Sequence, residues 1–277
     1  MIWTSHSILL RETIFRLTIE NKAPLRVGAG RDPPVGSPVD LSVLRIPYEG
    51  KHLPYIPGSS LKGVFRSFAS LLAKKKGLRK ACSGVSEDVC KPDEKGGAES
   101  FYNNACLICK IFGSPGYRSL ASFGDAYPID DEGRFYPYKT GVRRGIRIGR
   151  RTGAVSGSSM YDVEYVEPGA KFRFSIRCKN LPNYALGLLS KVLLLIQEGE
   201  AKLGGFKTRG FGGVSIDTNE LEFRTEPVKH GRMEALDEKD MEFLLHAETE
   251  NGYFEASNDA AWELIKKLAE IWEHAKL

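Results

Sequence analysis

Four cysteines lie in a short polar stretch and have the spacing of metal ligands. Cys82, Cys90, Cys106 and Cys109 follow the pattern C-x7-C-x15-C-x2-C, which ends in a CxxC pair. Four thiolates bind Zn²⁺ tetrahedrally, and such a site orders a loop that is too polar to form its own core. The pattern predicts a structural zinc site, with a first spacing longer than in a standard zinc knuckle. A disulfide pair is the alternative, because intracellular disulfides occur in hyperthermophiles.

The other residues suited to metal or acid–base chemistry are scattered. Cys178 follows Phe174 and Ile176 in a stretch that alternates apolar and polar residues, so we expect it to be a core residue. The histidines show no ligand or catalytic spacing, and they stand at His6, His52, His230, His246 and His274.

The segment PYIPGSSLKGVFR, Pro54–Arg66, has the residues of an anion site at a helix start. Ser59 and Ser60 follow a turn fixed by proline and glycine, and free N–H groups at a helix N-terminus favour an anion. Lys62 and Arg66 are four residues apart, so both can reach a phosphate bound there. The alternative is an ordinary capped helix with exposed cations.

A glycine-rich segment, LGGFKTRGFGGV at Leu203–Val214, combines cations with aromatic rings. Its glycines let a backbone approach a ligand closely, Lys207 and Arg209 add positive charge, and Phe206 and Phe211 can stack on bases. The combination predicts RNA binding. A glycine-rich hairpin that binds no ligand is the alternative.

An arginine-rich segment lies between these two motifs. Guanidinium groups pair bidentately with phosphates, and glycines recur there every four residues, which favours a pliable loop or hairpin over a helix. We expect phosphate contacts from this segment, and a solvated loop is the alternative. Its cations are Arg143, Arg144, Arg147, Arg150 and Arg151.

The net charge of +5 conceals two unlike regions. Residues 217–277 contain 16 acidic and 7 basic residues, a net charge of −9, which leaves +14 for residues 1–216. A segregated positive charge of this size indicates a polyanionic partner, most often a nucleic acid. The sequence also has no apolar run of the roughly 20 residues that a bilayer span needs. Arg11 and Glu12 interrupt the region where a signal peptide would be apolar, so we expect a cytoplasmic protein without a membrane partner.

The elements that must position these residues follow a recognisable order. The sequence predicts a strand at Ile14–Ile19, a long ordered loop over 28–58, and a helix at Ser59–Lys76 capped by Ser59 or Ser60. After an irregular insertion at 80–110 it predicts two antiparallel strands around the turn at 167–170, a helix at Tyr184–Gln197, a strand pair at Phe211–Phe223 and a helix at Asp259–Ala275 capped near Ser257 or Asn258. This order predicts an α+β fold with a ferredoxin-like β-α-β-β-α-β core and large insertions.

The paired motifs PYIPGSSLKGVFRSF and LGGFKTRGFGGV resemble those of the repeat-associated mysterious protein (RAMP) superfamily of CRISPR systems. The resemblance is to the guide-binding backbone subunits of type III (Csm/Cmr) effector complexes. It extends to VDLSVLRIPYEGKHLPYIPGSSLKG, a loop with an acidic residue before the helix, and to IRIGRRTGAVSGSSMYDVEYVEPGAKFRF, the family's thumb segment and following strand. It spans residues 10–216 in order, and the acidic residues beyond lie outside it.

The resemblance implies an RNA-recognition-like fold that polymerises along a guide RNA, with a thumb hairpin that disrupts guide–target pairing. In cleaving subunits a loop aspartate is required for cleavage of the target RNA with a divalent cation, Mg²⁺ or Mn²⁺. The matching residue is Asp40, with Asp32 as a less well aligned neighbour. An aspartate that only caps a turn is the alternative, since the Asn-Pro that usually follows the family's acidic residue is missing.

The resemblance also implies partners and a domain organisation. The partners are a guide RNA, a target RNA and other subunits of the complex. We expect residues 1–216 to form the core, with 80–110 as a Cys-rich insertion and 139–165 as the thumb, and residues 217–277 to form an acidic extension. A non-catalytic scaffolding or capping subunit and a guide-processing endoribonuclease are the alternative functions. The latter typically relies on histidine, for which the N-terminal half offers only His6 and His52.

Overall fold

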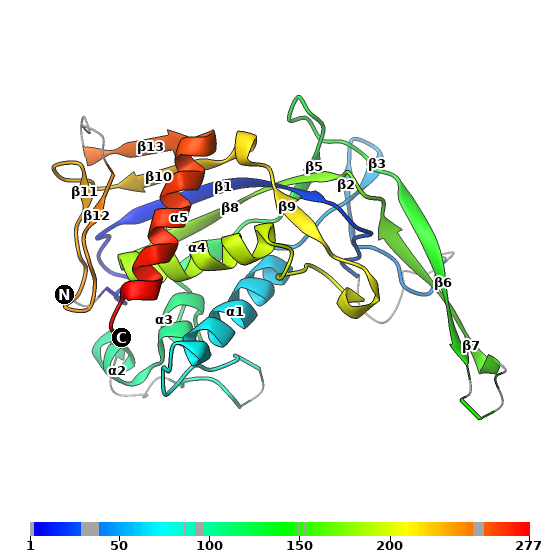
Figure 1. Ribbon diagram of the computed structural model, residues 1–277, viewed down its shortest axis with the longest axis horizontal. Coiled ribbons are helices and arrows are strands. Elements are labelled where there is room, and N and C mark those ends of the chain that lie inside the picture. Colours follow the sequence, from blue (N-terminus) through cyan, green and yellow to red (C-terminus); the bar gives the residue numbers. More distant parts are fainter. Residues whose placement is uncertain are drawn as a thin grey trace.

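A seven-stranded antiparallel sheet forms the centre of the computed structural model (Figure 1). The structure describes residues 3–28, 39–85, 87–91, 97–148, 150, 151, 153, 155–245 and 252–277. Strand β1 (Glu12–Asn21) is central, with β8 (Lys171–Lys179) on one side and β10 (Glu222–Glu226) and β9 (Val214–Ile216) on the other. Strands β4 (Ala121–Phe123) and β5 (Tyr127–Ile129) pair with β8, and β13 (Phe254–Ser257) pairs with β10.

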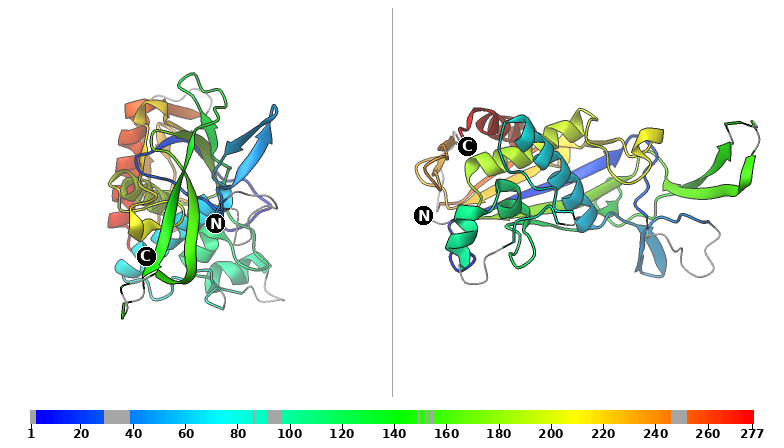
Figure 2. Two further views of the ribbon diagram at one scale, coloured as in Figure 1. Left: turned by 90° about the vertical axis from the view of Figure 1, so that its right-hand side faces the viewer. Right: turned by 90° about the horizontal axis from the view of Figure 1, so that it is seen from below.

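The chain order confirms the predicted ferredoxin-like core. Helix α1 (Gly58–Lys75) follows β1, and helix α4 (Asn183–Gln197) follows β8, so two β-α-β units interleave to give the order β10-β1-β8-β4. Both helices lie on the same side of the sheet (Figure 2). The predicted alternation in β8 is present: Phe172, Phe174, Ile176 and Cys178 are buried, and burial raises the pKa of the Cys178 thiol.

The region after residue 216, which carries the net negative charge, packs on the preceding part of the chain. Helix α5 (Asn258–His274) lies against α4, and the side chain of Trp272 is 1% exposed. Strands β10 and β13 extend the central sheet, while β11 (Arg232–Met233) and β12 (Phe243–Leu244) form a small sheet of their own. The Asp240 carboxylate accepts the backbone N–H groups of Asn183 and Tyr184, so this region also caps the start of α4. The division of the chain at residue 216 stays a prediction.

Two predicted strand pairs have other partners than expected. The turn at 167–170 is present, but the strand before it, β7 (Val155–Val166), pairs with β6 (Thr140–Ile148) and not with β8. The β6–β7 hairpin projects beyond the end of the central sheet (Figures 1 and 2). Similarly, β9 and β10 both pair with β1 instead of with each other.

The cap predicted for α1 is wrong, whereas Ser257 stands at the N-cap position of α5 as predicted. Helix α1 begins at Gly58, whose N–H donates to the Asp125 carboxylate over 2.7 Å, so neither Ser59 nor Ser60 caps it. Helix α5 begins at Asn258, and the Ser257 side chain makes no capping hydrogen bond.

The segments between these elements carry the candidate site residues. The predicted loop over 28–58 contains the hairpin of β2 (Arg45–Tyr48) and β3 (Lys51–Pro54), and Asp32 lies outside the described residues. The Cys-rich insertion contains α2 (Gly97–Asn104) and α3 (Leu107–Phe112). No helix in the described ranges combines the length and apolar character needed to cross a membrane.

Candidate nucleic-acid interface and metal centre

The glycine-rich loop packs tightly against the segment that follows β1. The N–H groups of Gly205 and Gly212 donate to the carbonyls of Arg26 and Pro24 over 2.8 and 2.9 Å. A Cβ at Gly204 would lie 2.2 Å from the Arg26 carbonyl oxygen, so a larger residue could not approach this closely. The glycines thus have a packing role, and they hold the tip of the loop, including a short 3-10 turn at Lys207–Arg209, in a fixed place.

Aromatic rings and arginines from the loop face the β6–β7 hairpin. The Arg143 guanidinium lies 4.8 Å from the centre of the Phe211 ring, and Arg209 Nη1 donates to the Tyr161 hydroxyl over 2.5 Å. The rings of Tyr161 and Phe206 stack with their centres 6.5 Å apart. Phe206 adopts a left-handed backbone with φ of 57°, which is strained for a residue with a side chain and is common at ligand sites.

These residues surround a hollow between the hairpin and the loop, which we call the thumb pocket. Its volume is about 570 Å³. On the hairpin, Gly145 lies opposite Tyr161, and a Cβ there would come within 2.3 Å of the tyrosine ring. The glycine therefore lets the ring lie flat against the hairpin. The pocket is lined by Arg143, Arg144, Gly145, Ile146, Tyr161, Val163, Phe206, Arg209 and Phe211.

A second hollow, which we call the α1 groove, lies between helix α1 and the glycine-rich loop. Its volume is about 320 Å³, and Ser60 and Lys207, both predicted to bind RNA, line it. Burial lowers the pKa values of Lys207 and of Arg26, which also lines the groove. Because both cations are partly desolvated, a phosphate in this groove would interact with them more strongly than with exposed lysines. The sequence prediction missed Arg26, an isolated arginine in a loop.

The remaining predicted RNA contacts lie elsewhere. Ser59 is exposed on the first turn of α1, where the Asp125 carboxylate already satisfies an N–H group. Burial, and then the nearby Arg66 charge, lower the pKa of Lys62, which does not line the α1 groove. Arg150 and Arg151 are exposed at the tip of the hairpin.

Two further arginines predicted to bind RNA, Arg144 and Arg147, lie on the β6–β7 hairpin. Arg144 is paired with Asp162 over 3.0 Å. Arg147 lies on β6, and its side chain falls outside the described residues.

Asp40 lies beside the β6–β7 hairpin, at the level of the Arg144–Asp162 pair midway between its base and its tip. Its carboxylate is exposed and accepts the N–H group of Asp162 over 2.8 Å. The next residue, Leu41, pairs with Val163 in parallel, through its N–H to the Asp162 carbonyl and its carbonyl to the Glu164 N–H. The segment that carries Asp40 is therefore bridged to the β7 edge of the hairpin.

Glu164 fastens the segment that carries Asp40 to the hairpin. It is 8% exposed and accepts hydrogen bonds from the Val43 N–H over 3.0 Å, the Thr140 hydroxyl over 3.0 Å and Arg45 over 2.8 Å. Burial alone would raise the pKa of Glu164, but the hydrogen bonds from Arg45 and Val43 hold it below its ordinary value. Glu164 therefore stays ionised and holds the Asp40 segment in position.

The face of the sheet opposite the helices is a poor candidate for RNA binding. Side chains alternate along β8, so Arg173 and Arg177 lie on this face, opposite the buried Phe172. Arg173 pairs with Glu220 over 3.0 Å and Arg177 with Glu12 over 3.8 Å. These cations are neutralised by neighbouring carboxylates, whereas Arg143 and Arg209 of the thumb pocket lie beside aromatic rings.

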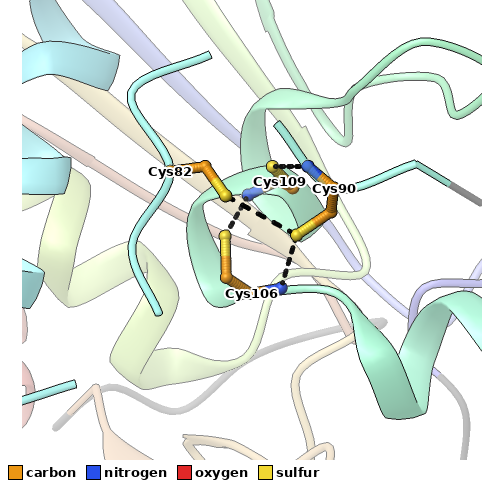
Figure 3. A group of neighbouring side chains, drawn as sticks. All are labelled: Cys82, Cys90, Cys106 and Cys109. Atoms are coloured by element: carbon orange, nitrogen blue, oxygen red, sulfur yellow. Dashed lines mark hydrogen bonds between the residues drawn. The ribbon is translucent and has the colours of Figure 1, made fainter. Parts of the chain in front are cut away.

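The four cysteines of the insertion converge, as predicted (Figure 3). Cys82, Cys90, Cys106 and Cys109 are buried, and their sulfur atoms all lie within 4.8 Å of one another. Their thiols are free, so the disulfide alternative is wrong. A zinc ion bound at about 2.3 Å by four thiolates requires sulfurs roughly 3.8 Å apart, and those of Cys82 and Cys90 are 3.7 Å apart. The cluster can therefore hold a metal ion such as zinc.

Backbone N–H groups donate to three of the four sulfurs, although burial raises the pKa of Cys82 and the hydrogen bond with Cys106 raises that of Cys109. The sulfurs of Cys90, Cys106 and Cys109 accept the N–H groups of Cys106, Cys109 and Cys90 over 3.3, 3.5 and 3.5 Å. Cys106 is also the N-cap of α3. The hydrogen bonds to Cys106, first among them one from Cys109, hold its pKa well below that of an ordinary thiol.

Comparisons with known proteins identify relatives of the part of the chain that carries this site. The family model described as the RAMP superfamily matches residues 18–215. A protein named CRISPR system Cms endoribonuclease Csm3, from Methanothermobacter thermautotrophicus, is 27% identical over 233 residues, which cover 76% of this chain and 85% of the relative. The family match includes α1, the insertion, the β6–β7 hairpin and the glycine-rich loop.

Proposed function

Because this chain belongs to the RAMP superfamily, we propose that it is a guide-RNA-binding backbone subunit of a type III CRISPR effector complex. The thumb pocket is the observation that carries this proposal. Arginines and aromatic rings converge there beside the α1 groove, and together they suit a single strand whose bases stack while its phosphates pair with cations. The relative named as an endoribonuclease Csm3 supports the same assignment.

The α1 groove and the thumb pocket would contact different parts of the guide RNA. Arg26 and Lys207 in the α1 groove would pair with backbone phosphates, while Phe206 and Tyr161 in the thumb pocket offer ring faces to a base. Such contacts read no sequence, as a subunit that must accept any guide requires. A target RNA paired to the guide and the neighbouring subunits of the complex are its further partners.

We also propose that Asp40 is the catalytic residue for cleavage of target RNA. Its exposed carboxylate lies beside the hairpin that would disturb guide–target pairing and unstack a target nucleotide. The carboxylate can accept the proton of a 2′-hydroxyl that attacks the adjacent phosphate, which breaks the bond from phosphorus to the 5′-oxygen of the next nucleotide and leaves a 2′,3′-cyclic phosphate; the released 5′-oxygen takes up a proton. A divalent cation, Mg²⁺ or Mn²⁺, would neutralise charge that develops on the phosphate oxygens.

A scaffolding subunit without activity is the second candidate. The bond from the Asp162 N–H gives Asp40 a structural role that would explain this residue without any chemistry. A guide-processing enzyme that uses His6 has less support, because the His6 ring packs 5.1 Å from the Tyr117 ring and bonds the Arg118 carbonyl.

Cleavage by the reconstituted complex with guide and complementary RNA separates the two roles of Asp40. Asp40→Asn keeps an oxygen for the Asp162 N–H but cannot take up a proton, so it should assemble normally and lose cleavage opposite this subunit. Asp40→Ala should lose cleavage and also loosen the attachment of this segment to β7. Wild-type cleavage by the asparagine variant would leave only the scaffolding function.

The cysteine cluster is proposed to hold a structural zinc ion. Four buried sulfurs within 4.8 Å of one another, three of which accept backbone N–H groups, suit Zn²⁺, which would stabilise an insertion with little apolar core. Elemental analysis of the native protein should give about one zinc per chain. Less than half an equivalent, or retention of zinc by Cys106→Ser at the wild-type level, would contradict this assignment.

A further inference from the structure

Helix α1 presents two faces with different surroundings. Ser60, Gly63 and Ser67 line the α1 groove beside the glycine-rich loop. Arg66 and Ser70, one turn apart, face the Cys-rich insertion instead. The residue predicted to bind a phosphate at position 66 therefore belongs to the face that holds the cysteine cluster.

The Arg66 guanidinium is held by the insertion at two atoms. Its Nη2 donates to the sulfur of Cys109 over 3.4 Å, and its Nη1 donates to the carbonyl of Gly113 over 2.9 Å. One turn later the Ser70 hydroxyl donates to the Cys82 carbonyl over 2.9 Å. Helix α1 is thus bonded to two of the four cysteines, one at each end of the insertion.

The packing around Arg66 leaves it little freedom to turn toward RNA. A Cβ at Gly84 would lie 2.2 Å from its Nε atom, so the backbone of the insertion presses directly on the guanidinium. That Nε atom is buried and has no hydrogen-bond partner in the described part of the chain. Arg66 does not line the α1 groove, where Ser60 and Lys207 lie.

We propose that Arg66 is a positioning residue of the metal site and does not contact guide RNA. A divalent ion with four thiolates has a net charge of −2, and a guanidinium bonded to one sulfur offsets part of it. Arginine suits this place because its fork bonds a sulfur and a carbonyl together, which one lysine ammonium reproduces poorly. The inference rests on the proposed zinc site, and it replaces the expectation that Arg66 pairs with a phosphate.

Metal retention and RNA binding, measured on the same variants, test this assignment. Zinc release is followed with a chromogenic chelator, and the coordination is followed by the thiolate-to-metal absorption of the cobalt-substituted protein. Binding of single-stranded RNA is measured over a range of salt concentrations. Arg66→Gln should speed zinc release about 10- to 100-fold and leave the salt dependence of RNA binding unchanged. Arg66→Lys should lie between this variant and the wild type, and it provides a folded variant if the glutamine substitution prevents folding.

Lys207→Gln is the matched control, because it removes a cation from the α1 groove. It should reduce the slope of log affinity against log salt concentration by about 0.7 and leave zinc release unchanged. Wild-type zinc release in both Arg66 variants, or a slope lowered by Arg66→Gln as much as by Lys207→Gln, would overturn the assignment. A wild-type protein without zinc would overturn the metal site as well, which distinguishes the two failures.

Discussion

Replacing Glu164 by glutamine should destabilise the base of the hairpin, because this carboxylate joins three segments. It is 8% exposed and accepts bonds from Val43, Thr140 and Arg45, whose side chain is 28% exposed. Removing one partner of a fully buried ion pair costs about 3–5 kcal/mol. Since Arg45 keeps some solvent and glutamine keeps one acceptor oxygen, we expect about 2–3 kcal/mol.

The loss should depend on pH in a defined direction. The folded-state pKa of Glu164 lies below the unfolded value of 4.5, so its contribution is complete above that value and is lost as the pH falls through the folded pKa. The difference in unfolding free energy between wild type and Glu164→Gln should therefore be constant near neutral pH and shrink below about 4.5.

Chemical and thermal unfolding at several pH values provide the measurement. At pH 7 the melting temperature should fall by about 5–10 °C. Glu167→Gln is the matched control, since Glu167 is exposed three residues further along and should change stability by less than about 0.5 kcal/mol. If Glu164→Gln behaves like Glu167→Gln at pH 7, or if its deficit is unchanged at pH 4, the proposed anchoring role is refuted.

Three further perturbations test other parts of the structure. Asp125→Ala removes the cap of α1 and should cost about 1 kcal/mol in urea unfolding, whereas Asp125→Asn should cost less because asparagine also caps helices. Gly145→Val should displace the Tyr161 ring, close the thumb pocket and weaken RNA binding about 5- to 100-fold in a filter-binding assay, with unchanged zinc content. Arg209→Ala should weaken guide binding and flatten its salt dependence, and an unchanged slope would exclude a phosphate contact.

The fold was predictable where the chain follows a local period. The alternation of Phe172, Phe174 and Ile176 identified β8, and the apolar spacing located α1 and α4 to within one residue at either end. The partner of each strand was not predictable from the same pattern. Periodicity indicates which face of a strand is buried, but not which strand lies beside it. The turn at 167–170 indicates only that the chain reverses, so the sequence predicted β8 as the partner of β7, whereas the partner is β6.

The candidate site was predictable only where residues stand in a motif. The cysteine spacing located the cysteine cluster, and the glycine-rich motif located the loop beside both hollows. Arg26, Asp125 and Glu164 went unnoticed, because each is a single polar residue whose partners are distant in sequence. The same limit applies to Arg66. Helical spacing correctly predicted that Arg66 lies near Lys62, but it could not show that the Cys-rich insertion covers Arg66.

The pairing of Leu41 with Val163 has a consequence for where a target would be cut. Backbone hydrogen bonds on both sides of this bridge tie the segment that carries Asp40 to β7, so the protein backbone sets the separation between the Asp40 carboxylate and the projecting hairpin. A subunit that cleaves with Asp40 would therefore cut the target at a fixed distance from the hairpin. Cleavage sites would then shift with the number of subunits along the guide and not with the nucleotide sequence of the target.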